Sequence, residues 1–169
     1  EIFSTSSGAG ALDRLIMARL LILWHSRTGG SAAMARAAYD AARGECDVAL
    51  KSAEDADASD LLSADGILFV CPENLASMTG EMKAFFDRAY YPALGQIEGR
   101  PYATMICAGT DGDGAARQIA RIATGWRLRA VAPTIIVCTH AQTPEAILAP
   151  KHIPAADLER ASAGGAALA

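Results

Sequence analysis

An unbroken apolar run followed at once by a polar, glycine-containing loop is the feature that most constrains this fold. The run, Leu20–Leu23, is typical of a parallel strand that is buried on both faces. The loop, Ser26–Ser31, leads into an alanine-rich segment, 31–43, that we expect to be a helix. Unpaired N–H groups and the dipole at such a helix start favour an anion, and three hydroxyls can donate to it. The sequence therefore predicts a phosphate site, with an ordinary, well-capped βα loop as the alternative.

The rest of the chain alternates predicted strands with predicted helices. Further apolar runs predict the remaining strands: 46–50, 67–71, 102–108 and part of 128–139. The clearest helical pattern, 80–91, repeats apolar residues on one face: Met82, Phe85, Phe86 and Ala89. We expect Pro92 to end this helix and Pro133 to interrupt the last strand. Such alternation indicates an α/β fold with a single doubly wound five-stranded parallel sheet and helices on both faces.

Length and charge bound the domain organisation and the classes of partner. The 169 residues suit one domain, and a formal charge of −4 gives no general attraction to nucleic acid. No apolar run approaches the roughly 20 residues of a membrane span, so we expect none. Residues 1–10 are rich in serine and glycine, and Met17 stands just before the first strand. We expect residues 17–169 to form the domain and residues 1–16 to be a cloning remnant or a disordered extension.

The four cysteines show no spacing typical of zinc sites or redox pairs. Cys71, Cys107 and Cys138 each lie near the end of an apolar run, as buried thiols do. We interpret all four as free thiols in a reducing compartment and expect a cytoplasmic protein. A redox cysteine at Cys71, which borders a polar loop, is the alternative.

Three polar loops follow predicted strands at the same edge of the sheet. They are Ser26–Ser31, Pro72–Thr79 and Gly109–Gly114, and each is rich in small or hydrogen-bonding residues. Ligands of open parallel sheets bind beyond the carboxyl ends of the strands. The three loops together therefore predict one binding site. We expect no metal site, because the three histidines are scattered along the chain.

These loops resemble those of the flavodoxin-like family of FMN-binding proteins, including its NAD(P)H-dependent FMN reductase and quinone reductase branches. HSRTGGS resembles the family's phosphate loop, PENLASMTGEMKAFFDR its second flavin loop with the following helix, and GTDGDG stands where the third flavin loop belongs. The resemblance covers residues 18–169 and implies a sheet order of 2-1-3-4-5. It also implies a set of cofactor-binding residues: Ser26, Arg27, Thr28, Gly29, Gly30, Ser31, Pro72, Glu73, Asn74, Leu75, Ala76, Ser77, Met78, Gly109, Thr110, Asp111, Gly112, Asp113 and Gly114.

The resemblance implies an FMN-binding oxidoreductase in which NAD(P)H reduces the bound flavin and the flavin reduces a quinone or another small acceptor. Leu75 and Met78 would lie against the flavin ring, and no side chain is expected to act as a catalytic acid or base. Neither Pro72–Thr79 nor Gly109–Gly114 contains Trp or Tyr, so one face of the ring stays open, as an enzyme needs. The alternatives are a flavodoxin-type electron carrier with a protein partner, and a binding module that has lost the cofactor.

Several other features of the sequence each allow two interpretations. Asp111 and Asp113 would lower the reduction potential of the flavin if their side chains point inward. The alternative is that both are solvated turn residues. Arg117 and Arg121, four apart, would bind the phosphates of NAD(P)H or form a solvated helix face. Trp24 and His25 would edge the flavin ring, or pack as a core residue and its polar neighbour. Quinone reductases of this fold often build the flavin site across a subunit interface, which makes a homodimer or homotetramer an open expectation.

Overall fold

A parallel sheet forms the centre of the molecule. The computed structural model describes residues 18–169, so the extension expected over 1–16 and the start expected at Met17 lie outside the described residues. The sheet order is β2-β1-β3-β5-β6, with β4 paired to β3 and β7 paired to β5. The strands are β1 (Arg19–Trp24), β2 (Asp47–Ser52), β3 (Gly66–Asn74), β4 (Ser77–Met78), β5 (Pro101–Ala108), β6 (Arg129–Ala130) and β7 (Ile135–Cys138). Because β6 and β7 are two pieces of one edge strand, the expected order 2-1-3-4-5 is confirmed, as is the interruption near Pro133.

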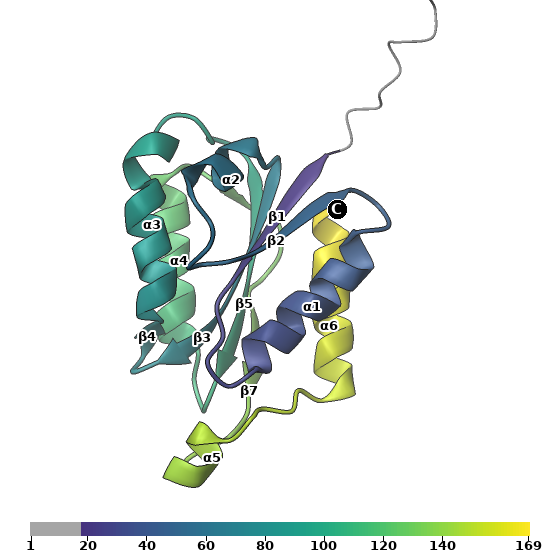
Figure 1. Ribbon diagram of the computed structural model, residues 1–169, viewed down its shortest axis with the longest axis vertical. Helices are drawn as coiled ribbons and strands as arrows, with labels where there is room; N and C mark the ends of the chain where they lie inside the picture. Colours follow the sequence, from purple (N-terminus) through teal and green to yellow (C-terminus); the bar gives the residue numbers. More distant parts are fainter. Residues whose placement is uncertain (1–17) are drawn as a thin grey trace, which may run out of the picture.

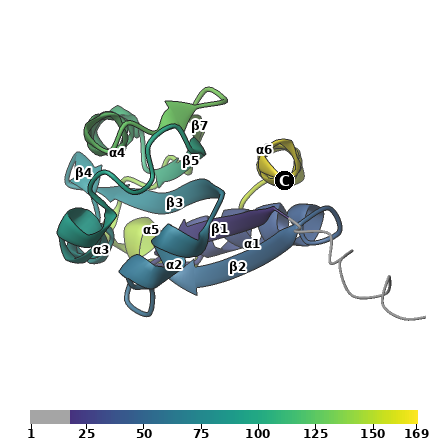
Figure 2. The same cartoon turned by 90° about the horizontal axis from the view of Figure 1, so that it is seen from above.

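Helices cover both faces of the sheet, as expected (Figure 1). Seen from above, α1 and α6 lie on one side of the strands and α3 and α4 on the other (Figure 2). The short helix α5 lies beyond the carboxyl ends of the strands (Figure 1). The helices are α1 (Gly30–Ala42), α2 (Ala58–Ser63), α3 (Gly80–Ala93), α4 (Asp113–Gly125), α5 (Pro144–Leu148) and α6 (Ala155–Leu168).

The alternation of side chains along β1 explains why both faces need a cover. Leu21 and Leu23 belong to the core on the α3–α4 side, whereas Leu20 and Ile22 belong to the core on the α1–α6 side. All four are essentially inaccessible to solvent. A central strand of this kind loses its hydrophobic stabilisation if either helical layer is absent.

Helix α3 follows its predicted pattern but is longer than expected. Met82, Phe85, Phe86 and Ala89 are all buried against the sheet. Pro92 was expected to end the helix, but it lies inside the last turn, and the helix continues to Ala93. Because the helix ends one residue after the proline, the missing N–H costs only one hydrogen bond of the last turn.

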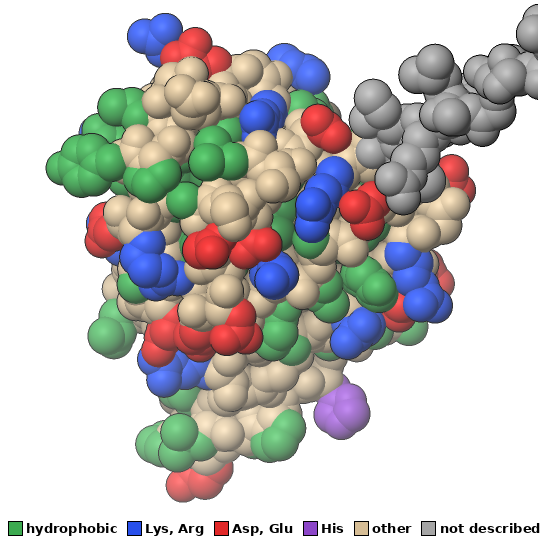
Figure 3. Space-filling view, turned by 45° about the horizontal axis from the view of Figure 1, so that its top comes forward, with side chains coloured by type: hydrophobic (Ala, Val, Ile, Leu, Met, Phe, Trp, Pro, Cys, Tyr) green, Lys and Arg blue, Asp and Glu red, His purple; other side chains and the backbone are tan. Residues whose placement is uncertain are grey.

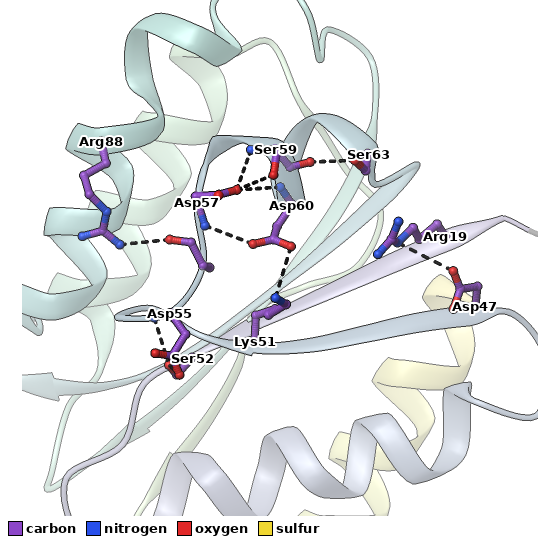
Figure 4. Close-up of polar contacts among 11 residues, drawn as sticks. Arg19, Asp47, Lys51, Ser52, Asp55, Asp57, Ser59, Asp60, Ser63 and Arg88 are labelled. Carbon is purple, nitrogen blue, oxygen red and sulfur yellow. Dashed lines mark hydrogen bonds and ion pairs between the residues drawn. The ribbon is translucent and has the colours of Figure 1, made fainter.

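The connection from β2 to α2 is fixed by polar contacts, one of them from α3 (Figure 4). Asp57 caps α2 by accepting hydrogen bonds from the backbone N–H groups of Ser59 and Asp60, and the Asp60 carboxylate accepts from the Asp57 N–H. Arg88 of α3 donates to the carbonyl of Ala53 at 2.6 Å. These bonds hold the polar segment that follows β2 against α3. Within residues 18–169, no helix has the length and apolar character needed to cross a membrane.

Candidate functional site

The loop between β1 and α1 leads into a helix start that no side chain of the described part of the chain caps. Gly29 has φ of 94°, a left-handed conformation that glycine adopts without strain, and its N–H donates to Ser26 Oγ at 3.1 Å. Among residues 18–169 no side chain caps α1, and the first turn of this helix carries no acidic residue. The N–H groups and the positive end of this helix therefore remain available to an anion.

The side chain of Ser31 is the strongest indication that a ligand binds at the start of α1. The residue is 1% exposed, and among the described residues its Oγ has no hydrogen-bond partner. A buried hydroxyl without a partner is unfavourable by roughly 1–3 kcal/mol. An anionic oxygen at the start of α1 would satisfy this hydroxyl together with the free backbone N–H groups. The chemistry of the residues present thus fits a phosphate.

The segment after β3 is a hairpin, where the sequence predicted a loop from Pro72 to Thr79. Strand β3 runs on to Asn74, and Asn74 and Glu73 pair with Ser77 and Met78 of β4. The two-residue turn consists of Leu75 (φ 53°) and Ala76 (φ 58°). Such turns need positive φ at both positions and usually carry glycine or asparagine. Leucine and alanine are not typical of such a turn, so the hairpin could not be predicted from these two residues. Leu75 at the tip is fully exposed.

Glu73 joins the second loop to the third. Its carboxylate accepts hydrogen bonds from the N–H groups of Gly112 (2.9 Å) and Ala115 (3.0 Å), at the start of α4. The hairpin also packs so closely on Gly114 that a Cβ there would lie 2.1 Å from the Ala76 carbonyl oxygen. Glu73 therefore fills the N-terminus of α4, whereas among the described residues no side chain caps the start of α1.

The predicted site residues differ in their exposure to solvent. Asn74, Leu75, Ala76, Thr110, Asp111 and Asp113 are exposed, whereas Met78 is buried in the core. Asp111 Oδ1 accepts from the Asp113 N–H at 3.3 Å, which agrees with the interpretation of this pair as solvated turn residues. Ring contacts from Leu75 and Met78 stay predictions.

Two side chains that sequence reasoning missed, Gln118 and Glu81, hold the loops together. Gln118 Oε1 of α4 accepts from Ser77 Oγ and from the Met78 N–H, both at 2.9 Å. Arg27, in the first loop, donates to Glu81 of α3 at 2.7 Å. These pairs are 41 and 54 residues apart in the chain, so no local spacing could have revealed them.

A fourth segment, between β7 and α6, also reaches the first loop. The Lys151 N–H donates to the Thr28 carbonyl at 2.7 Å, and Nζ of the same lysine donates to three carbonyls at the end of α5. Gly30 lies so close to β5 that a Cβ on it would be 2.5 Å from Cys107 Sγ and 3.4 Å from Lys151 Cβ. The chain at Lys151 thus lies against the first loop and the start of α1.

The cysteines are free thiols, as expected, although Cys138 is only half-buried. Cys71 is completely inaccessible, and burial raises its pKa to about 12. A thiol with that pKa stays protonated near neutral pH and is a poor nucleophile. The alternative reading of Cys71 as a redox cysteine therefore lacks support.

Arg117 and Arg121 lie on the exposed face of α4. Together with Ala120, Thr124 and Gly125 they line a shallow hollow of about 540 Å³. Neither arginine forms an ion pair with any described residue within 4.0 Å. Both readings of this pair, a phosphate contact and a solvated face, agree with this exposure.

Comparison with known proteins assigns the chain to a family. A family model described as NADPH-dependent FMN reductase matches residues 46–142, more than half of the chain. The chain belongs to that family. The matched range begins after the first loop, so the assignment of Ser26–Ser31 to a phosphate rests on the geometry of α1.

Individual relatives carry the name of flavodoxins. A flavodoxin of Aquifex aeolicus is 31% identical over 100 residues, which are 58% of this chain and 54% of that protein. The chain thus spans about half the length of the curated relative it matches. The structure of a flavodoxin from the domain Archaea has a TM-score of 0.72 at 19% identity, covering 89% of this chain and 95% of that one. A Streptococcus pneumoniae TIGR4 flavodoxin gives 0.72 at 21% identity, with 89% and 97% covered. These structures establish a flavodoxin-like fold.

Proposed function

We propose that this chain binds FMN at the carboxyl edge of its sheet, with the phosphate at the start of α1. The single observation that carries the proposal is the buried Oγ of Ser31 at the start of α1, where the described residues provide neither a partner for this hydroxyl nor a side-chain cap for the helix. The phosphate of FMN is dianionic near neutral pH, and Ser26, Thr28 and the first N–H groups of α1 complete a donor set for it. Membership of the FMN reductase family supports the same cofactor.

The flavin ring would then extend from α1 toward the hairpin of β3 and β4 and the loop 109–114. The exposed Leu75 would offer an apolar contact, and Asn74 and Ala76, which are also exposed, would offer polar groups for the edge of the ring. When bound, FMN supplies the hydride chemistry. The residues of this chain bind and orient it.

As the finer function we propose an oxidoreductase that takes electrons from NAD(P)H and passes them to a quinone or another small acceptor. The family match supports the reductant, and the absence of Trp and Tyr from Pro72–Thr79 and Gly109–Gly114 supports an open ring face for nicotinamide. Arg117 and Arg121 are the candidate contacts for the nicotinamide cofactor's phosphates.

A flavodoxin-type electron carrier is the second candidate, because the Aquifex aeolicus relative carries that name. A carrier would exchange electrons with a redox protein and would not turn over NAD(P)H itself. The two candidates share the cofactor and differ in the reductant, so one experiment separates them.

The test begins with the absorbance spectrum of the purified protein before and after addition of FMN. Riboflavin, which lacks the phosphate, serves as the control ligand. We expect FMN to bind and riboflavin to bind far more weakly, whereas equal binding would contradict a phosphate site at α1. Anaerobic addition of NADH or NADPH to the FMN-loaded protein is then expected to bleach the flavin absorbance promptly. A flavin that stays oxidised would favour the carrier.

A further inference from the structure

A buried histidine links the phosphate loop to the start of α3. His25 directly follows β1, precedes Ser26 and is 5% exposed. Its Nδ1 lies 2.8 Å from Oγ1 of Thr79, the equally buried residue that precedes α3. This bond joins the residue before the first loop to the residue after the hairpin, and both segments belong to the proposed cofactor site.

The other ring nitrogen of His25 faces two carboxylates from two different elements. Nε2 lies 3.4 Å from Glu54 Oε1, in the connection after β2, and 3.7 Å from Glu81 Oε2, in the first turn of α3. Oε2 of Glu81 is buried and has no hydrogen-bond partner among the described residues. The other oxygen of Glu81 accepts from Arg27 of the phosphate loop. His25 and Arg27 thus connect the first loop to α3 at two points, which we call the clasp.

The charge on His25 decides the electrostatic balance of the clasp. The pKa of Glu81 lies below its ordinary value, chiefly because its own backbone N–H donates to the carboxylate, and also because His25 and Arg27 are close. Near neutral pH the group therefore contains two carboxylates, Arg27 and the imidazole. A protonated His25 brings the net charge of this group to zero, whereas a neutral His25 leaves one negative charge beside the phosphate site. Histidine is the side chain that changes charge in this pH range.

We propose that His25 is a positioning residue for the cofactor, which holds the phosphate loop against α3 and makes the affinity for FMN rise as the imidazole gains its proton. This inference rests on the proposed function. His25, Thr79, Glu81 and Arg27 act on the loop that receives the phosphate, and none of them has to touch the flavin. The sign follows from the charges: protonation removes a net negative charge from the surroundings of a dianion and strengthens both contacts of Nε2.

The experiment compares FMN dissociation constants at pH 6 and pH 8, at fixed ionic strength, for the native chain and for His25→Asn. Asparagine can keep the hydrogen bond to Thr79 but cannot become charged. Dividing the variant's constant by the native one at each pH cancels the ionisation of FMN itself. We expect this ratio to be about three- to fivefold larger at pH 6 than at pH 8, the size of one partly exposed ion pair. An equal ratio at both values would overturn the proposal.

Glu54→Gln with Glu81→Gln tests the same clasp with His25 left in place. We expect this double variant to lose the His25-dependent part of the pH effect, while Asp87→Asn, on the outer face of α3, keeps the native behaviour. Native pH dependence in the double variant would overturn the proposal even if His25→Asn does not fold.

Hydrogen exchange of the amides of residues 26–31 in the cofactor-free protein supplies a readout that needs no FMN. After correction for intrinsic rates, we expect protection to be about threefold higher at pH 6 than at pH 8, and this difference to vanish in His25→Asn. A chain with this difference but without FMN binding would keep the clasp and refute the proposed function. A chain that binds FMN but lacks both His25-dependent effects would refute the clasp alone.

Discussion

At the scale of single residues, the proposed site contains a group that lowers the stability of the cofactor-free protein and is expected to bind FMN. Ser31 keeps a buried hydroxyl without a partner at the start of α1. Replacing it by alanine removes an unsatisfied polar group and a ligand for the phosphate in one step. We therefore expect Ser31→Ala to raise the free energy of unfolding of the cofactor-free protein by up to about 1 kcal/mol. We expect it also to weaken FMN binding by about tenfold or more, as the loss of a hydrogen bond to a charged group does.

Denaturant unfolding and FMN titration measure the two effects on the same preparation. Ser63→Ala, which removes an exposed hydroxyl of α2, is the control and should leave FMN affinity unchanged. If Ser31→Ala lowered stability and affinity together, the serine would be a structural residue with a partner of its own.

The hairpin turn stores strain at two other residues. Ala76 has φ of 58° and no glycine-like freedom, and a left-handed residue of this type is unfavourable by roughly 1–2 kcal/mol. We expect Ala76→Gly to raise the free energy of unfolding by about 0.5–1 kcal/mol, since glycine's added freedom in the unfolded chain offsets part of the relief. The same change at Ala84, on the exposed face of α3, should lower it by about 1 kcal/mol. Two changes of the same sign in urea unfolding would contradict the turn geometry.

Some features of single residues could be predicted from the sequence and others could not. The loop at Ser26–Ser31 could be predicted because its glycines and hydroxyl residues follow an unbroken apolar strand. The hairpin at Leu75 and Ala76 could not, because neither residue carries the signal of its turn. The bond between His25 and Thr79 joins residues 54 apart, and only the folded sheet brings them together.

At the scale of elements, sequence patterns predicted the sheet and its helical cover well. Apolar runs mark β1, β3 and β5, and the spacing of Met82, Phe85, Phe86 and Ala89 marks the buried face of α3. The ends of elements were less predictable. Strand β3 runs past the expected Cys71 to Asn74, because its pairing with β4 continues the strand beyond the apolar run. Tertiary pairing, which no local pattern encodes, decides such boundaries.

The packing of α6 on α1 depends on a glycine. A Cβ on Gly165 would lie 2.4 Å from the carbonyl oxygen of Ala38, which is backbone and cannot move aside cheaply. We expect Gly165→Ala to lower the free energy of unfolding by about 1–3 kcal/mol, as overpacking does. Gly125→Ala at the end of α4, where a Cβ meets nothing within 4 Å, is expected to be neutral or stabilising. Thermal unfolding of both variants checks the contrast, and a neutral Gly165→Ala would mean that the two helices are farther apart.

The cap of α2 makes stability depend on pH. The Asp57 pKa is lowered chiefly by the hydrogen bond from the Ser59 side chain, and then by the backbone N–H groups of Asp60 and Ser59. A lowered folded-state pKa means that this contribution is present above the ordinary aspartate value near ~4 and is lost as the pH falls through the folded value. The difference in unfolding free energy between the native chain and Asp57→Ala should therefore be largest near pH 7 and shrink toward pH 3. A difference that stays constant over this range would refute the cap.

At the scale of the whole molecule, the exposed apolar side chains suggest self-association. Tyr91 and Leu94 are 80% and 51% exposed, and Tyr90 lies beside them. Apolar side chains gather over this end of α3 in Figure 3, at the upper left. Aromatic side chains that can be buried at the centre of a contact are the usual anchors of protein interfaces. We therefore propose that copies of this chain associate through the end of α3, as a homodimer or as a homotetramer.

This surface is well separated from the proposed cofactor site. Helix α3 has 14 residues, which at 1.5 Å per residue is about 21 Å, and its first turn, not its last, adjoins the hairpin. We expect Tyr91→Lys with Leu94→Lys to convert the oligomer to a monomer while FMN affinity stays within about twofold of the native value. Light scattering after size-exclusion chromatography gives the mass, and FMN titration of the same fractions gives the affinity. Leu148→Lys, on the exposed side of α5, is the control for added charge and should leave the mass unchanged. A native monomer would refute the interface, whereas a monomeric variant that loses FMN would mean that a second copy contributes to the cofactor site.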